Sequence, residues 1–321
     1  MERESMTPLA SSYRAALATA ATDALLRRRR PQRLPGRAVV VQDHQIPADL
    51  VARYAELFHR AGEPLDPQDV PSVLVHVAAF PAAMELMADR DFPLPLLGMV
   101  HLENRVVHHA AVPSGAPLTV AASATALAPH PSGTTVDLVV TVHGPGGPER
   151  APQLLWEGTS TYLAAGVRLE SQERPPRAGH PAFVAPAMTA RWSLPGSTGR
   201  DYAAVSGDYN PIHLNPLTAR ALGQKGMIAH GMYLAGRMLA GREPAGGGYS
   251  WQIGFATPVL LPGTVSLGFA HPEPSRTEVT AWDGRRQRPH FTGSITEFTT
   301  ESTTGSTTED RPVGRTPQSP S

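Results

Sequence analysis

Asp208 and His213 place a carboxylate and an imidazole five residues apart in the second half of the chain. Histidine titrates near neutral pH, so such a pair can exchange protons with a bound molecule as general acid and general base. Side chains on one helix face lie three or four residues apart, which this spacing does not match. Asn210 precedes Pro211, and a residue before proline is disfavoured in helical geometry. The pattern therefore predicts that a turn presents both side chains.

Helix signals flank this turn. Asn215 followed by Pro216 is typical of a helix start, with asparagine as the N-cap and proline at the first helical position. Gly223 is a natural stop for that helix. Gly207 lets the backbone turn tightly just before Asp208. We expect two short helices with the acid and the base between them.

Two sequence elements contain these residues. The first runs from Tyr202 to Ala219 and centres on Gly-Asp-Tyr-Asn-Pro-Ile-His; the second is Ile-Ala-His-Gly-Met, at 228–232. Together they resemble the signature of the MaoC-like, R-specific enoyl-thioester hydratases, which run in reverse as 3-hydroxyacyl-thioester dehydratases. Without these neighbours, the simpler interpretation would be a satisfied loop histidine at His213 and a turn cap at Asp208.

The resemblance implies roles for five residues. Asp208 and His213 would hold one water between them and act together in the proton transfers, as a coupled pair. Gly231, at the start of an apolar helix, would offer its backbone N–H to the thioester oxygen. Asn210 and Ser206 would support the loop.

The implied reaction is the reversible hydration of 2-trans-enoyl thioesters to (3R)-hydroxyacyl thioesters, in fatty-acid or related lipid metabolism. We expect no metal and no redox cofactor, since the thioester of coenzyme A or of an acyl carrier protein is itself the substrate. A hotdog thioesterase, which directs water at the thioester carbonyl, and a non-catalytic acyl-binding subunit are the alternatives. The intact Asp-x-Asn-Pro-x-His pattern disfavours both. Acyl chain length and physiological direction stay open.

The order of predicted elements repeats. The first half reads as a strand at 38–42, helices at 48–61 and 71–87, the latter interrupted near Pro81, and strands at 99–108, 118–126, 134–142 and 154–162. The second half reads as a strand at 190–194, the helical signature region, a helix at 231–240, and strands at 249–255, 264–270, 277–282 and 290–298. This self-similarity indicates a duplicated unit.

Together with the resemblance, the repeat predicts an α+β double hotdog, in which two antiparallel sheets each wrap a central helix and pack as a pseudo-dimer. Residues 92–104 and 137–139 resemble the first half of the actinobacterial 3-hydroxyacyl-thioester dehydratases. The first half lacks Gly-Asp-x-Asn-Pro-x-His, so we expect one active site, with the first half shaping the acyl pocket. Further association into a homodimer stays open.

We divide the chain into five segments. They are a peripheral N-terminal extension (1–34), a non-catalytic hotdog domain (35–166), a proline-rich linker (167–186), a catalytic hotdog domain (187–299) and a disordered tail rich in Thr, Ser and Pro (300–321). The role of the basic run Arg27 to Arg30 stays open; such runs are more often solvated helix ends than phosphate sites.

Composition excludes several classes of protein. The 321 residues carry 28 Lys+Arg and 28 Asp+Glu, so no overall positive charge points to nucleic acid. No cysteine is present, which excludes disulfides and thiolate metal sites. His101, His108 and His109 lack a completing carboxylate pattern for a metal. No apolar run is long enough for a membrane span or a signal peptide, and we expect a cytoplasmic protein.

Overall fold

The computed structural model describes residues 2–3, 6–7, 9, 11–14, 30–58, 66, 69–146, 151–170, 173–176, 179 and 182–298. The predicted disordered tail at 300–321 and the arginines at 27–29 lie outside this set. The helices and strands of the two halves follow the expected order, with several strand ends extended. The α+β hotdog-type fold predicted from the sequence is thereby confirmed.

Each half consists of a leading strand, helices and then four strands. The first half has β2 (Val39–His44), α2 (Ala48–Phe58), α3 (Ser72–Ala88), β3 (Met99–His108), β4 (Leu118–His130), β5 (Gly133–His143) and β6 (Leu154–Ala165). The second half has β7 (Ala190–Leu194), α4 (Thr198–Ser206), the 3-10 helix η1 (Pro211–His213), α5 (Pro216–Ala221), α6 (Gly231–Leu239), β8 (Tyr249–Phe255), β9 (Gly263–Glu273), β10 (Arg276–Asp283) and β11 (Arg288–Glu297).

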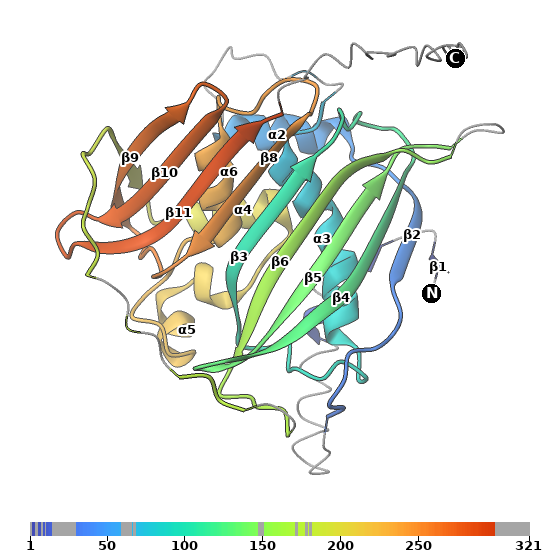
Figure 1. Cartoon of the computed structure of the whole chain (residues 1–321), viewed down its shortest axis with the longest axis horizontal. Coiled ribbons are helices and arrows are strands. Elements are labelled where there is room, and N and C mark those ends of the chain that lie inside the picture. The colour runs from blue at the N-terminus through green and yellow to red at the C-terminus, as the bar shows by residue number, and fades with distance from the viewer. Residues whose placement is uncertain are drawn as a thin grey trace, which may run out of the picture.

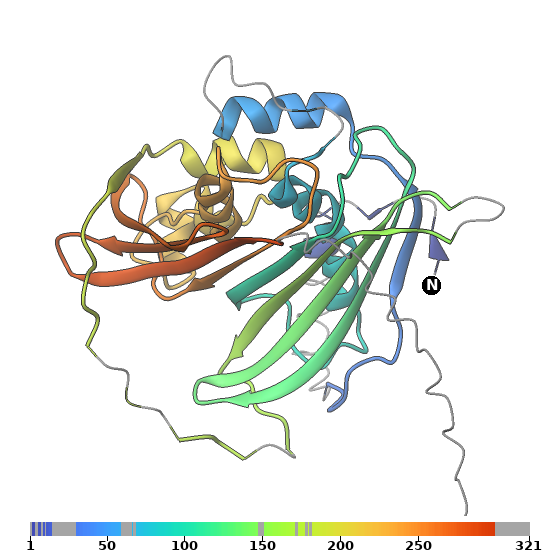
Figure 2. The same ribbon diagram turned by 45° about the horizontal axis from the view of Figure 1, so that its top comes forward.

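The strands of both halves join in one continuous sheet. Within the described residues its order is β1-β2-β4-β5-β6-β3-β8-β11-β10-β9-β7, where β1 (Glu2–Arg3) pairs parallel to β2 and the other neighbours are antiparallel. The halves meet at the β3–β8 pair, in which Glu103 lies opposite Gly254 and His108 opposite Tyr249. Helices α2 and α4, one from each half, lie side by side on the same side of the sheet (Figures 1 and 2).

A central helix fills the concave face of each half. Helix α3 packs against the first-half strands and is buried around most of its circumference, while α6 occupies the equivalent place in the second half (Figure 1). The predicted interruption near Pro81 is wrong, because α3 continues through this residue. A proline inside a helix costs about 3 kcal/mol. Each large apolar side chain that is fully buried contributes about 1.5–3 kcal/mol of stability. Because α3 is apolar on all sides and buries many such side chains, this gain outweighs the cost of the proline.

Ser72 links the two halves beneath the sheet. Its hydroxyl oxygen accepts a hydrogen bond from Nε1 of Trp156 on β6 at 2.9 Å and another from Nε1 of Trp251 on β8 at 2.8 Å. All three side chains are buried. One hydroxyl therefore satisfies a tryptophan from each half.

Replacing Ser72 by alanine is expected to lower the free energy of unfolding by about 2–4 kcal/mol, because two buried indole N–H groups lose their acceptor. Urea denaturation of Ser72→Ala measures this loss. Ser250→Ala, at a partly exposed position on the same strand as Trp251, is the matched control. A Ser72→Ala variant as stable as the control would contradict the stabilising role given to the two hydrogen bonds that Ser72 accepts from the tryptophans.

Candidate active site

The turn between α4 and α5 is built by local backbone preferences. Helix α4 ends at Gly207, whose φ of 71° is left-handed and whose N–H bonds to the Ala203 carbonyl. Asn210 caps η1 by accepting from the Ile212 N–H at 3.4 Å, and Asn215 caps α5 by accepting from the Leu217 N–H at 2.8 Å. The expected caps are confirmed, and they fix the directions in which the acid and the base leave the chain.

Asp208 follows the left-handed glycine and folds back on its own loop. Its Oδ1 accepts a hydrogen bond from the Asn210 N–H at 3.1 Å. Its own N–H donates to Oγ of Ser206 at 3.2 Å. Ser206 and Asn210 thus bond to Asp208 from both sides within the loop. The Asp208 side chain keeps 24% of its surface exposed and is accessible to a substrate.

His213 ends η1 and is buried. Its Nδ1 donates to the Ile228 carbonyl at 2.8 Å, which leaves Nε2 as the acceptor nitrogen of a neutral ring. Burial lowers the pKa of His213 below its usual value, and the charge of Asp208 opposes this only in part. The ring is therefore neutral and able to take up a proton near pH 7. Gly199 is required behind it, since a Cβ there would lie 2.0 Å from the His213 carbonyl oxygen.

His230 lies beside both residues. Its Nε2 donates to the Asp208 carbonyl at 3.0 Å, and its ring stacks on that of His213 with centroids 3.6 Å apart. Burial, followed by the neighbouring His213, lowers the pKa of His230 well below its usual value. The contacts of His230 support the positions of Asp208 and His213.

The three side chains enclose a small polar space. A carboxylate oxygen of Asp208 and one nitrogen from each of His213 and His230 all lie within 4.8 Å of one another. Two hydrogen bonds from one water span about 4.5 Å, so a single water fits between the carboxylate and His213. Nε2 of His230 bonds to the Asp208 carbonyl, while its buried Nδ1 has no hydrogen-bond partner among the described residues.

Gly231 begins α6, directly after His230, and no side chain caps this helix. The first amides of a helix have no intrahelical partner and lie at its positive end. A Cβ at Gly231 would lie 2.9 Å from Cζ of Phe255, so a larger residue would displace that ring. A glycine in this place leaves a backbone N–H that a ligand can approach closely.

The first half supplies a wall next to these residues. Tyr162 on β6 stacks on His101 of β3 at 4.5 Å, and His101 in turn lies 5.3 Å from Phe255 of the second half. Phe255 also packs against Gly231, and burial, followed by the charge of Asp208, raises the pKa of Tyr162. The site therefore lies where the halves meet.

Tyr13 was missed by the sequence analysis. Its hydroxyl donates to Oδ1 of Asp208 at 3.1 Å, and Leu9 and Ser12 are buried nearby in the chain. The prediction that residues 1–34 are peripheral is therefore wrong for this segment. Its alanine-rich sequence carries no motif, and a contact across 195 positions leaves no local signal.

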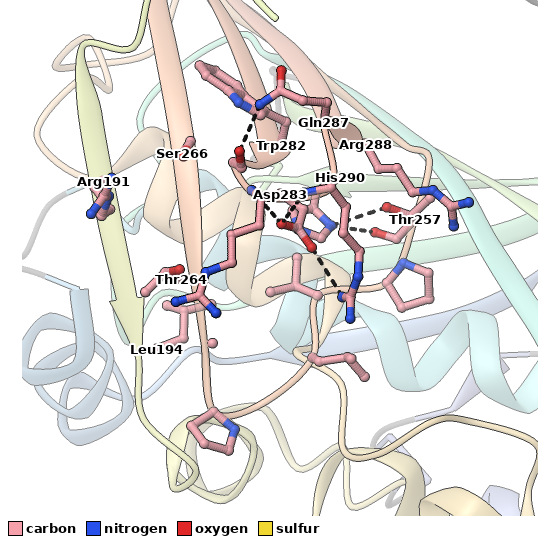
Figure 3. Close-up of a pocket in the computed structure, with 18 of the residues that line it drawn as sticks. Arg191, Leu194, Thr257, Thr264, Ser266, Trp282, Asp283, Gln287, Arg288 and His290 are labelled. Carbon is pink, nitrogen blue, oxygen red and sulfur yellow. Dashed lines mark hydrogen bonds and ion pairs between the residues drawn. The ribbon is translucent and has the colours of Figure 1, made fainter.

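A separate groove of about 1320 Å³ lies along β7, β9 and β10 (Figure 3). Among its described lining residues, one carboxylate, Asp283, accompanies five cationic side chains: Arg191, Lys225, Arg285, Arg286 and Arg288. Asp283 pairs with Arg286 at 3.2 Å. The wall of the groove is tied to the loop before α6, because the Val259 carbonyl accepts from the Ala229 N–H at 2.8 Å.

None of the helices in the described part of the chain has the length and apolar character needed to cross a bilayer.

Comparison with known proteins finds related sequences and related folds. The MaoC like domain family matches residues 183–283. The 3-hydroxyacyl-thioester dehydratase X of Mycobacterium tuberculosis is 32% identical over 271 residues, which span 83% of this chain and 91% of that protein. The crystal structure of HtdX from M. tuberculosis has a TM-score of 0.66 at 29% identity, covering 82% of this chain and all of that one. A MaoC-like dehydratase from Phytophthora capsici shares the fold, with a TM-score of 0.64 at 16% identity over 85% of this chain and 98% of that one. The chain belongs to the MaoC-like dehydratase family.

Proposed function

We propose that this protein is a hydro-lyase that adds water to 2-trans-enoyl thioesters to give (3R)-hydroxyacyl thioesters, and catalyses the reverse dehydration. The observation that carries the proposal is the Asp208–His213 pair, in which a carboxylate oxygen and a ring nitrogen lie within 4.8 Å of each other. The relative at 32% identity is named a 3-hydroxyacyl-thioester dehydratase, which supports the same reaction class here. Fatty-acid or related lipid metabolism is the proposed setting, and the cytoplasmic location and domain boundaries stay predictions.

The proton transfers follow from the tautomer of His213. With Nδ1–H held by the Ile228 carbonyl, Nε2 presents a lone pair to the water. The water loses a proton as its oxygen bonds to C3, and a proton is delivered to C2 from the same face. Asp208 and His213 act as one coupled unit, because a single water contacts both. Dehydration follows the same path in reverse: the proton at C2 is removed, and the hydroxyl at C3 leaves as water.

The Gly231 N–H is the proposed oxyanion donor. Addition at C3 places negative charge on the thioester oxygen, and a prepositioned donor is most effective where charge develops. The unpaired amides at the start of α6 provide such donors, and the positive end of the helix adds to their effect. The Phe255 ring occupies the space into which a side chain at position 231 would project, so this packing requires a glycine at that position.

A thioesterase is the competing activity on the same fold. An acyl-ACP thioesterase from Bacteroides thetaiotaomicron matches with a TM-score of 0.51 at 8% identity, which shows the fold alone. Thioester hydrolysis requires water to attack the carbonyl carbon. In the proposed arrangement the Gly231 N–H binds the carbonyl oxygen, and the water between Asp208 and His213 attacks C3 instead. A purely acyl-binding subunit is disfavoured because the Asp208 carboxylate stays accessible.

Asp208→Asn and His213→Ala are each expected to lower kcat for crotonyl-CoA hydration by about 10²–10⁴-fold, because each removes one half of the proton-transfer pair. Loss of the enoyl-thioester absorbance measures the rate, chiral analysis identifies the 3R-alcohol, and a thiol reagent detects hydrolysis. Circular dichroism confirms that both variants fold. Release of free thiol without hydroxyacyl product would establish a thioesterase, and tight binding of both crotonyl-CoA and a longer enoyl-CoA without turnover would favour an acyl-binding subunit.

The acid limb of the kcat/KM profile for hydration is expected to have its midpoint below pH 6.5. The active form of His213 is neutral, and burial lowers its pKa from 6.5, so protonation inactivates the enzyme only at a lower pH. Initial rates over a series of buffers at constant ionic strength measure the midpoint. A midpoint above pH 6.5 would argue against a buried, neutral His213 as the base.

We further propose that the basic groove receives the phosphate-bearing end of the thioester carrier. All five of its described cationic residues are exposed, and only Arg286 among them is paired with the Asp283 carboxylate of the groove. The chain as a whole carries equal numbers of acidic and basic residues, so this is a local concentration of positive charge. Such clusters raise the local concentration of anions.

Arg285→Glu and Arg288→Glu are each expected to raise KM for crotonyl-CoA by about three- to tenfold at low salt, with kcat unchanged, because both act on binding alone. Arg276→Glu, at the other end of β10, is the matched charge control. The N-acetylcysteamine thioester lacks phosphates and should be insensitive to all three variants. Equal effects on both substrates would contradict phosphate binding, and a response confined to acyl carrier protein substrates would identify the carrier.

A further inference from the structure

The described residues between Met6 and Arg14 are packed against the body of the protein at several points. Oγ1 of Thr7 donates to Oε2 of Glu85 on α3 at 2.6 Å. Leu9 is 6% exposed, and its Cδ1 lies next to Gly207, the residue before Asp208. Ser12 is also buried. The segment is therefore anchored to both halves, beside the loop that carries the acid.

Tyr13 is the residue through which this segment reaches the site. Its hydroxyl donates to Oδ1 of Asp208 at 3.1 Å, and the same oxygen accepts from the Asn210 N–H at 3.1 Å. Nε2 of His230 lies 3.9 Å from Oδ2, which is beyond hydrogen-bonding distance. Two donors therefore occupy Oδ1, and Oδ2 is the oxygen left for the water.

The direction of the Tyr13 hydrogen bond is fixed by charge. The pKa of Tyr13 is raised by burial and then by the neighbouring Asp208 carboxylate. The phenol therefore keeps its proton throughout the neutral range and can only donate to the carboxylate. A donor to a carboxylate fixes its orientation and is stronger than a bond between neutral groups.

The segment leaves the site accessible. With Tyr13 in contact, the Asp208 side chain still exposes 24% of its surface, and Tyr13 itself is only partly buried. A segment that plugged the site would cover the carboxylate completely. The contact is thus suited to holding the acid in place during turnover.

We propose that Tyr13 is a positioning residue of the active site, which holds Oδ1 of Asp208 so that Oδ2 faces the reacting water. The N-terminal segment is on this account a working part of the site. The proposal rests on the hydration activity proposed above, and it assigns Tyr13 a role that acts through Asp208 and not through the substrate.

Tyr13→Phe removes one hydroxyl from the full-length protein and keeps the ring. We expect kcat for crotonyl-CoA hydration to fall about tenfold, the effect of losing one hydrogen bond to a charged group, with KM changed less than about twofold. Tyr209→Phe is the matched control, because its side chain is 58% exposed on the loop that carries Asp208. This variant should retain the wild-type rate. Thermal denaturation of both variants separates a loss of stability from a loss of rate.

Two kinetic results would overturn the proposal. An unchanged kcat would show that the hydroxyl does not position Asp208, and a lower melting temperature in the same variant would then identify Tyr13 as a packing residue. A higher kcat or a lower KM would identify the segment as an inhibitory plug.

A second measurement tests the contact without turnover, so that failure of the proposed activity can be told apart from failure of this inference. Fluorotyrosine is placed at position 13, and its fluorine NMR resonance is compared between the wild-type background and Asp208→Asn. We expect the resonance to shift with Asp208→Asn and to stay fixed with Asp201→Asn, a change at an exposed acid on α4. A resonance that does not shift with Asp208→Asn would contradict the hydrogen bond between Tyr13 and Asp208, even if the protein has no hydratase activity.

Discussion

The hydrogen bond from Nδ1 of His213 to the Ile228 carbonyl is the interaction on which the proposed site depends. It selects the tautomer that leaves Nε2 free to take a proton. The same residue, Ile228, donates its N–H to the Ile212 carbonyl at 3.2 Å and bridges to Leu260. The orientation of the imidazole is thus set by backbone that is itself held from two directions, and a small loop can keep the geometry that proton transfer requires.

Electrostatics around this bond are arranged to keep both rings neutral. His213 and His230 stack at 3.6 Å, where two imidazolium charges would repel, and burial disfavours the charged form of each. The carboxylate of Asp208 keeps contact with solvent and is held by N–H and O–H donors. A neutral base and a carboxylate on either side of one water are a suitable arrangement for moving protons without building up net charge in the site.

Local signals in the sequence were sufficient for the central loop. Asn210-Pro211, Asn215-Pro216 and Gly207 each act over a few residues, so the caps and the turn could be predicted from them. Features that depend on packing could not. Pro81 suggested an interruption, but burial of α3 on the sheet outweighs the local cost. Tyr13 reaches Asp208 only because the sheet and Leu9 bring distant segments together, and the basic groove gathers arginines from separate strands and turns.

The central claim is that one water, held between Asp208 and His213, supplies both the hydroxyl and the proton from one face of the enoyl group. The most direct test is hydration of crotonyl-CoA in deuterium oxide, with the configurations at C2 and C3 of the product determined by NMR. We expect a 3R-hydroxyl and a deuterium at C2 added to the same face. Addition to opposite faces, or a product with no hydroxyl at C3, would contradict it.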